Sequence, residues 1–401
     1  MTSSFVIARS LGPSKYGLLA TAIGIAGTLF ILNLVGFDQL FLRKELGDVQ
    51  FRRYVAVVAG VSILVVVVAA FAWPNVVSTT RQLLVLWGVG LALAMFTQPW
   101  LLTPQRDLHF ASRARREIVL RVITASSIIA VAVGTRSPLW VAVSMLLAAA
   151  IPSSVLILRS HPNDAVVPTL GPGRAVGRGI TYATSGALYT LYMSIDVGLV
   201  GTLVGSTQAG YYGIASGFLT AAATFPIVMN NDVLRTRLYR CRDASDMVHA
   251  VLVKRHFLLL TLVAGTVGGV LMLVLAHPVV ELLFGPAYGT HVARLVMILA
   301  LAVLPNYFNS WAANVLIAGD DVHLVVGVQT VMTVFNVSAN VVLLPRHGVA
   351  AAAWITLLTE ATGVVLFLYF VVTRDFRARS AAYRAVPFGP APPTAGGSSG
   401  T

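Results

Sequence analysis

The sequence predicts an all-α, polytopic membrane protein, and its composition and the length of its apolar runs both point to that class. Hydrophobic residues make up 57% of the 401 residues and charged residues only 11%, with a mean hydropathy of +0.82. A soluble domain carries about 25% charged residues, so this chain lacks the polar surface that would cover a soluble core. A β-barrel would instead show alternating segments of about ten residues, and none are visible.

The apolar residues fall into runs of the length that spans a bilayer as a helix, about 20 residues. We expect eleven spans, at 16–37, 55–72, 83–102, 117–135, 139–158, 181–204, 209–228, 257–276, 292–317, 322–344 and 349–372. Pro99 and Pro305 lie inside two of them and predict kinks, because proline removes a backbone hydrogen-bond donor. Each kink serves either helix packing or a hinge used in transport.

The basic residues separate by side of the membrane. Loops after alternate spans hold 21 of the 28 Lys and Arg residues, the opposite side holds 6, and Arg121 lies within a span. An excess of this kind marks the cytoplasmic side, so the C-terminus is expected in the cytoplasm of a multi-pass cell-membrane protein. The net charge of +13 is then a topology signal and requires no nucleic acid. A single cysteine, Cys241, excludes an internal disulfide.

A weak internal repeat organises the chain. An offset of 193 residues places residues 8–22 over residues 201–215, with Gly12 on Gly205 and Gly17 on Gly210. In both copies a short turn of small residues joins two apolar runs, and glycine suits such a reversal because it accepts positive φ. The spans that follow the two turns cross in the same direction. We therefore predict two parallel-repeat helical lobes around a central cavity.

The repeat also predicts the domain limits. We expect an N-lobe over 1–158, a cytoplasmic linker over 159–180, a C-lobe over 181–372 and a tail over 373–401 that is disordered from about 387. Residues 1–8 are apolar but too short to cross a bilayer, so the first lobe shows five complete spans and the end of another. Either the start lies further upstream, which we favour, or the first helix is missing.

Five segments occur in order along these spans: ARSLGPSKYG (8–17), GFDQLFLRKEL (36–46), DVGLVGTLVGSTQAGYYGIAS (196–216), ELLFGPAYG (281–289) and NVSANVVLLPRHGVAAAAW (336–354). Together they resemble the Wzx-type polysaccharide-biosynthesis flippases of the multidrug/oligosaccharidyl-lipid/polysaccharide exporter superfamily. The resemblance covers about residues 8–372. It implies two six-helix lobes around a central cavity, here in the twelve-helix form with the first helix cut off.

The resemblance implies transport of an oligosaccharide carried on a polyprenyl diphosphate from the inner to the outer leaflet. Membrane lipids, a coupling cation and other polysaccharide-assembly membrane proteins would be its partners. A sugar head with an anionic diphosphate needs a polar cavity, while the lipid tail stays in the bilayer through a lateral opening. Cation-coupled antiport of small molecules by the same fold is the main alternative.

An enzyme is not expected. The longest connections on the outer side, near residues 72–83 and 276–292, are too short to form a catalytic domain. No nucleotide-binding loop, zinc-ligand spacing or nucleophile motif occurs, so the sequence predicts no cofactor and no metal cluster. A membrane glycosyltransferase or polymerase and a receptor-like or structural role are weaker alternatives.

Acidic residues within the spans are the first candidates for the transport site. Asp196 and Glu360 lie at mid-span, where an ionised carboxylate costs about 2.5–3.5 kcal/mol, so each should face protein or cavity water. Each forms either a structural hydrogen bond or ion pair, or a site on the transport pathway. For Asp196 we favour binding of a coupling cation, exchanged for the cargo as the lobes rock about the linker.

The remaining candidates are basic or amide side chains. Arg121 either snorkels to lipid phosphates or contacts the diphosphate, and Arg9, at the outer end of the short first segment, has the same two interpretations. Asn336 and Asn340 are four residues apart and share a helix face, where they bond either neighbouring helices or sugar hydroxyls. The GxxxG pattern of Gly265 and Gly269 indicates helix packing.

Overall fold

The computed structural model describes residues 2–29, 35–42, 46–72, 77–107, 109–159, 172–243, 246–285 and 288–385. These residues form helices joined by short turns, with no strand in any of the described ranges. In chain order the elements are α1 Thr2–Leu29, α2 Val35–Leu42, α3 Asp48–Ala72, α4 Ser78–Ala94, the 3₁₀ turn η2 Met95–Thr97, α5 Gln98–Arg106, α6 Phe110–Thr135, α7 Pro138–Arg159, α8 Pro172–Leu203, α9 Ser206–Ile227, the π-helix η3 Val228–Leu234, α10 Arg235–Asp243, α11 Met247–Phe284, α12 Gly289–Ala318, α13 Val322–His347 and α14 Val349–Ala385.

The all-α membrane fold is confirmed. Nine helices of the described ranges are long and apolar enough to cross a membrane, and residues 187–203 of α8 form a shorter apolar helix. The second part of α1, after Gly12, covers the first expected span as far as Leu29, and residues 30–34 of that span lie outside the described residues. About eleven membrane helices are thus accounted for.

Several helices run past the expected span ends. Helix α11 begins at Met247 rather than near residue 257, α14 continues to Ala385, and α8 begins at Pro172, within the predicted linker. The linker residues 160–171 and the tail after residue 385 lie outside the described residues, so the domain limits stay predictions. Pro305 lies within the continuous helix α12, whereas the chain near Pro99 is interrupted one turn earlier by η2.

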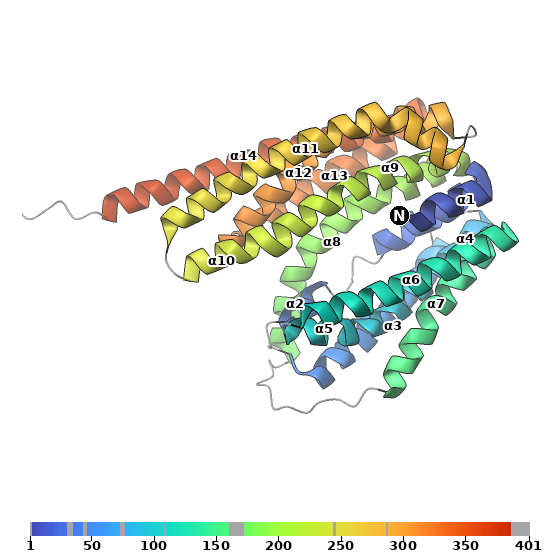
Figure 1. Ribbon diagram of the computed structural model, residues 1–401, viewed down its shortest axis with the longest axis horizontal. Coiled ribbons are helices and arrows are strands. Elements are labelled where there is room, and N and C mark those ends of the chain that lie inside the picture. Colours follow the sequence, from blue (N-terminus) through green and yellow to red (C-terminus); the bar gives the residue numbers. More distant parts are fainter. Residues whose placement is uncertain are drawn as a thin grey trace, which may run out of the picture.

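The helices form two groups that contact each other through α1, α2 and α8. Figure 1 shows α3–α7 below and α9–α14 above, with α10 and the last turns of α14 at the left and α8 reaching from the upper group down to α2. At the opposite end α1 packs against α8 and α9 of the upper group and against α4 and α6 of the lower group. We call α1–α7 the N-lobe and α8–α14 the C-lobe.

The two turns of the repeat meet where the lobes join. Gly12 interrupts α1 with φ 76° and ψ 167°, and Gly205 precedes α9 with φ 127° and ψ 162°, so both matched glycines adopt the conformation that the repeat requires. A Cβ on Gly17 would lie 1.6 Å from the carbonyl oxygen of Ser206, and one on Gly210 would lie 2.3 Å from that of Pro13. Because Ser206 is the repeat equivalent of Pro13, the contact is reciprocal, as across a two-fold axis. We call it the turn–turn contact.

The helices differ in how much of their apolar surface is buried within the protein. In the most apolar window of α6 and of α11 only 11% of residues are buried, whereas the corresponding share for α12 is 61%. Helix α12 is therefore the centre of the C-lobe, and α6 and α11 present apolar surface to lipid. Gly265 and Gly269 let α11 approach α12 closely, since a Cβ on Gly269 would lie 3.0 Å from the carbonyl oxygen of Ala300. The packing interpretation of this GxxxG pattern therefore has direct structural support.

The charge bias predicts the orientation of this bundle. With Cys241 replaced, cysteine at Gln208, beside the turn–turn contact, should react with an impermeant thiol reagent in whole cells. Cysteine at His249, an exposed position at the start of α11, should react only after the membrane is permeabilised. The reverse pattern would place the basic end outside and contradict the predicted topology.

Candidate functional site

A polar cluster surrounds Asp196 inside the C-lobe. Its side chain is only 4% exposed. Oδ2 accepts hydrogen bonds from the Tyr212 hydroxyl at 3.1 Å and the Thr356 hydroxyl at 3.0 Å, and a longer one from Asn336 Nδ2 at 3.4 Å. Oδ1 accepts from Asn340 Nδ2 at 3.0 Å. Four helices, α8, α9, α13 and α14, thus converge on one carboxylate.

A second buried carboxylate, Glu360, lies beside the first. Its Oε1 accepts from Asn306 Nδ2 at 2.8 Å and from the Tyr192 hydroxyl at 3.4 Å, and its Oε2 accepts from Asn309 Nδ2 at 2.7 Å. Asn309 Nδ2 also donates to the main-chain oxygen of Glu360 at 2.9 Å. These two hydrogen bonds fix the orientation of the Asn309 amide. The side chain of Glu360 is therefore surrounded by N–H and O–H donors.

Helical spacing links the two clusters. Tyr192 and Asp196 are four residues apart on α8, and Thr356 and Glu360 are four apart on α14. Residues at this spacing share a helix face. The two helices exchange partners, because Tyr192 of α8 donates to Glu360 while Thr356 of α14 donates to Asp196. The result is a continuous polar layer within an apolar bundle.

Oxygen acceptors outnumber donors around Asp196. Asn340 Nδ2 carries two hydrogens but lies within bonding distance of three oxygens, Asp196 Oδ1, Asn336 Oδ1 and the Asn336 main-chain oxygen. The buried Asn340 Oδ1 has no hydrogen-bond partner among the described residues. Such a group calls for an ion or a water. The oxygens of Asp196, Asn336, Asn340 and Thr356 are hard ligands, of the kind that hard cations prefer.

All the side chains that donate to the two carboxylates within the described ranges are neutral. In those ranges no three His, Cys, Asp or Glu side chains come together as a metal cluster. An ionised carboxylate without a counter-charge is costly at membrane depth. Among the described residues, the two carboxylates are thus held by neutral hydrogen-bond donors alone.

The family model for "Polysaccharide biosynthesis protein" matches residues 6–293, which is most of the chain. The chain belongs to this family. A comparison with curated protein sequences finds no match. The match supports the resemblance to flippases of the multidrug/oligosaccharidyl-lipid/polysaccharide exporter superfamily.

Solved structures of that superfamily share the fold. An inward-facing multidrug resistance MATE family transporter of the MOP superfamily superposes with a TM-score of 0.68 at 13% identity, covering 96% of this chain and 95% of its own. The lipid II flippase MurJ in an inward closed conformation gives 0.68 at 12% identity, with 92% and 85% covered. The eukaryotic MATE transporter AtDTX14 gives 0.64 at 14% identity, with 96% and 90% covered. At these identities the likeness concerns the fold.

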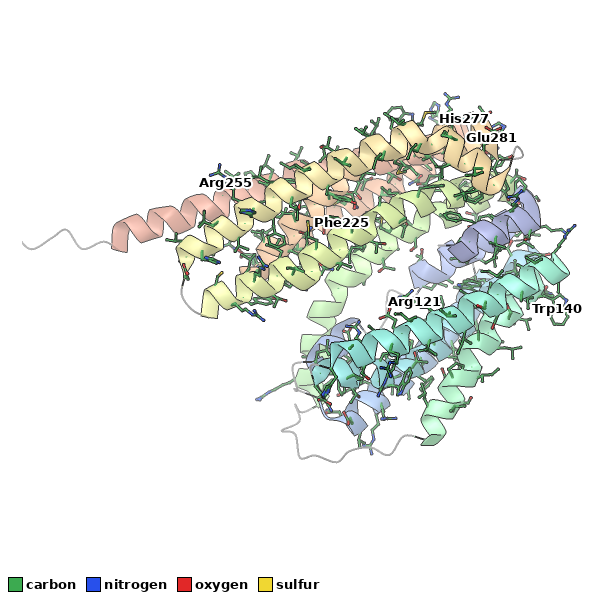
Figure 2. The ribbon with its side chains drawn as sticks, viewed as in Figure 1. Arg121, Trp140, Phe225, Arg255, His277 and Glu281 are labelled. Carbon is green, nitrogen blue, oxygen red and sulfur yellow. The ribbon has the colours of Figure 1, made fainter. Side chains whose placement is uncertain are left out.

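The two basic candidates of this family member lie away from the polar layer. Arg121 is an exposed residue of α6 that pairs with Glu117, one turn earlier, at 2.7 Å, and Figure 2 places it on the part of α6 near the C-lobe. Arg9 is exposed on the first segment of α1. The structure thus joins Asp196, Asn336 and Asn340 in one cluster with Glu360 adjacent, and leaves Arg9 and Arg121 outside it.

Reasoning from sequence missed five partners of the carboxylates: Tyr192, Tyr212, Asn306, Asn309 and Thr356. Four of them could have been found, because Tyr192 and Thr356 precede an acidic residue by four positions and Asn306 precedes Asn309 by three in an apolar span. The sequence also missed a polar cluster at η3. There Arg235 Nε donates to Asn314 Oδ1 at 2.8 Å, and Asn314 Nδ2 donates to Asn231 Oδ1 at 2.8 Å.

Proposed function

We propose that this chain is a flippase that moves a polyprenyl-diphosphate-linked oligosaccharide from the inner to the outer leaflet of the cytoplasmic membrane for polysaccharide biosynthesis. The observation that carries the proposal is the match to the polysaccharide biosynthesis family over residues 6–293. The two-lobe fold, shared with MATE transporters and a lipid II flippase, supplies the means. We infer no enzymatic activity, since the structural relatives are transporters.

The arrangement of the lobes supports alternating access. The lobes join at the turn–turn contact, at the end opposite the basic end, which the charge bias assigns to the cytoplasm. Helix α8 of the C-lobe also contacts α2 of the N-lobe (Figure 1). A rocking motion about the shared end would close the basic end and part the two turns. The polar cargo head would then pass between the lobes while the lipid tail remained in the bilayer. Arg121, exposed on α6 and paired with Glu117, stays a candidate for contact with either the diphosphate or lipid phosphates.

We propose that a monovalent cation at Asp196 drives the cycle. The excess of oxygen acceptors and the buried Asn340 Oδ1 without a partner among the described residues support this site. It lies within the C-lobe, apart from an anionic cargo between the lobes. Binding would therefore act on the cargo through the packing of α8, α13 and α14 rather than by contact. Release of the cation on the opposite side of the membrane would return the C-lobe to its starting conformation.

Cation-coupled antiport of small molecules is the second candidate. The fold likeness to multidrug transporters favours it, because the same lobes can serve either cargo. The neutral hydrogen-bond donors around Asp196 are compatible with cation coupling in either kind of transporter.

Proteoliposomes separate the two. The purified protein should move a fluorescent polyprenyl-diphosphate oligosaccharide between leaflets, measured as protection of the sugar from an impermeant lectin. Empty vesicles, and vesicles carrying the same sugar on a neutral lipid, are the controls. Uptake of a cationic dye without any movement of the lipid-linked sugar would overturn the flippase and establish the antiporter.

A further inference from the structure

Helix α11 is longer than its role as a membrane span requires. It has 38 residues, whereas α3, its counterpart in the repeat, has 25. Exposed Arg255 and the exposed His277–Glu281 pair lie near its two ends, and Figure 2 shows them on the outward side of the C-lobe. At 1.5 Å per residue, Arg255 and His277 are about 33 Å apart, close to the thickness of a hydrocarbon core. The turns before Arg255 therefore project into the headgroup layer.

This projecting part of α11 is not a typical water-facing helix end. Met247, Val248, Val251 and Leu252 are 50% to 75% exposed. Val248 and Leu252 continue the face that Leu259 and Val263 present to lipid, with Arg255 between the two stretches. The patch lies within about 12 Å of the hydrocarbon edge, the depth range of interfacial helices.

The neighbouring helix α10 adds positive charge to this surface. Leu238 and Cys241 of α10 belong to the same buried apolar cluster as Val253 and Phe257 of α11, and the two helices are in contact. Arg237 and Arg240 are exposed on α10, and the Arg237 guanidinium lies 5.7 Å from the centre of the Phe257 ring. Asp246 accepts from the His249 main-chain N–H at 2.9 Å and caps α11, so its acidic side chain is engaged at the helix start.

We propose that α10, residues 235–243, and the first turns of α11, residues 247–255, form a docking surface for the anionic headgroups of the inner leaflet. We call it the α10–α11 surface. Its apolar face is continuous with the lipid-facing face of α11, and exposed arginines flank it, a combination typical of interfacial helices that bind anionic lipid. The surface anchors the cytoplasmic end of the C-lobe to the membrane whichever cargo the lobes carry.

The anchor has a consequence for rocking. The cytoplasmic end of the C-lobe would be held by headgroups, so the N-lobe would make the larger movement relative to the bilayer. Anionic lipid would then change the balance between the two open states without touching the cargo.

Fluorescence quenching on the full-length protein in nanodiscs tests the proposal. A fluorophore at Val248, with Cys241 replaced, should be protected about fivefold or more from a water-soluble quencher when the disc contains phosphatidylglycerol, relative to a disc of phosphatidylcholine alone. Labels at lipid-facing Leu259 and at exposed His109 give the two reference levels. Arg240→Gln should reduce the effect of phosphatidylglycerol while leaving the Leu259 signal unchanged.

Each other outcome contradicts the proposal. Equal exposure of Val248 to the water-soluble quencher in both discs would show that the surface faces water. Equal protection in both discs would show that negative headgroups are not its ligand. Protection that appears only when a disc holds two copies of the protein would instead make the surface a dimer interface.

Discussion

Replacing Gly210 with alanine should impair the state in which the outer ends of the lobes are closed. The added Cβ would lie 2.3 Å from the carbonyl oxygen of Pro13, a backbone atom that cannot turn aside as a flexible side chain can. Overpacking of this kind costs typically about 1–3 kcal/mol. The cost falls only on the state with the turn–turn contact, so the closed-to-open ratio should fall by a factor of roughly 5 to 150. Flipping should decline accordingly.

The chain offers matched variants for this prediction. Gly17→Ala attacks the reciprocal half of the contact, where the Cβ would lie 1.6 Å from the Ser206 carbonyl oxygen, and should have at least as large an effect. Gly217→Ala is the control, because it lies on the same helix as Gly210 and a Cβ there would meet nothing within 4 Å. Equal transport rates for the Gly210 and Gly217 variants would show that the turn–turn contact plays no part in the cycle.

Replacing Asp196 with asparagine should abolish the dependence of transport on the coupling cation. Asparagine keeps the size of the side chain and most of its hydrogen bonds but removes the negative charge among the oxygens of Asn336, Asn340 and Thr356. Removing a residue that only hydrogen-bonds a metal ligand lowers the affinity for the metal about 10–100-fold. Removing the charged ligand itself should lower the affinity for the cation at least as much. Titration of flipping with sodium, potassium or protons in proteoliposomes measures it.

Glu360→Gln is the matched acid-to-amide control. Glu360 accepts from the fixed Asn309 amide and from Asn306, so a glutamine NH₂ would face another N–H donor. An unsatisfied buried group costs about 1–3 kcal/mol, so this variant should unfold at a lower temperature while keeping its cation dependence. If Asp196→Asn also keeps its full cation dependence, Asp196 is a structural residue and the coupling site lies elsewhere.

The sequence allowed the membrane fold and part of the site to be predicted, because both depend on local pattern. Span-length apolar runs identify helices, and the match of Gly12 to Gly205 located two turns whose positive φ the structure confirms. Asp196 was selected because an ionised carboxylate is costly in a bilayer, and Asn336 and Asn340 were selected because they share a helix face. Their partner Thr356 could have been selected by its spacing of four residues from Glu360, but its contact with Asp196 joins helices 160 residues apart and cannot be read from spacing.

Other features depend on packing that spacing alone does not encode. A kink was predicted at Pro305, and the structure shows one helix, α12, running through this residue with Asn306 and Tyr307 buried beside it. The π-helix η3 follows Pro226, and contacts from Asn230 and Asn231 to α12 hold it in place, with Asn230 Nδ2 3.1 Å from Ser310 Oγ. Arg121 was considered for contact with the cargo, yet its pairing with Glu117 could have been expected from their spacing of four residues.

The most direct test of alternating access is a pair of distances measured during transport. Spin labels at Ser14 and Thr207, which correspond in the repeat and flank the turn–turn contact, report the outer end; labels at Ala111 and Arg240 report the cytoplasmic end. In proteoliposomes supplied with lipid-linked oligosaccharide and the coupling cation, we predict a second, longer outer distance, accompanied by a shorter cytoplasmic one. A single unchanged outer distance in vesicles that flip the lipid would contradict the rocking of the two lobes.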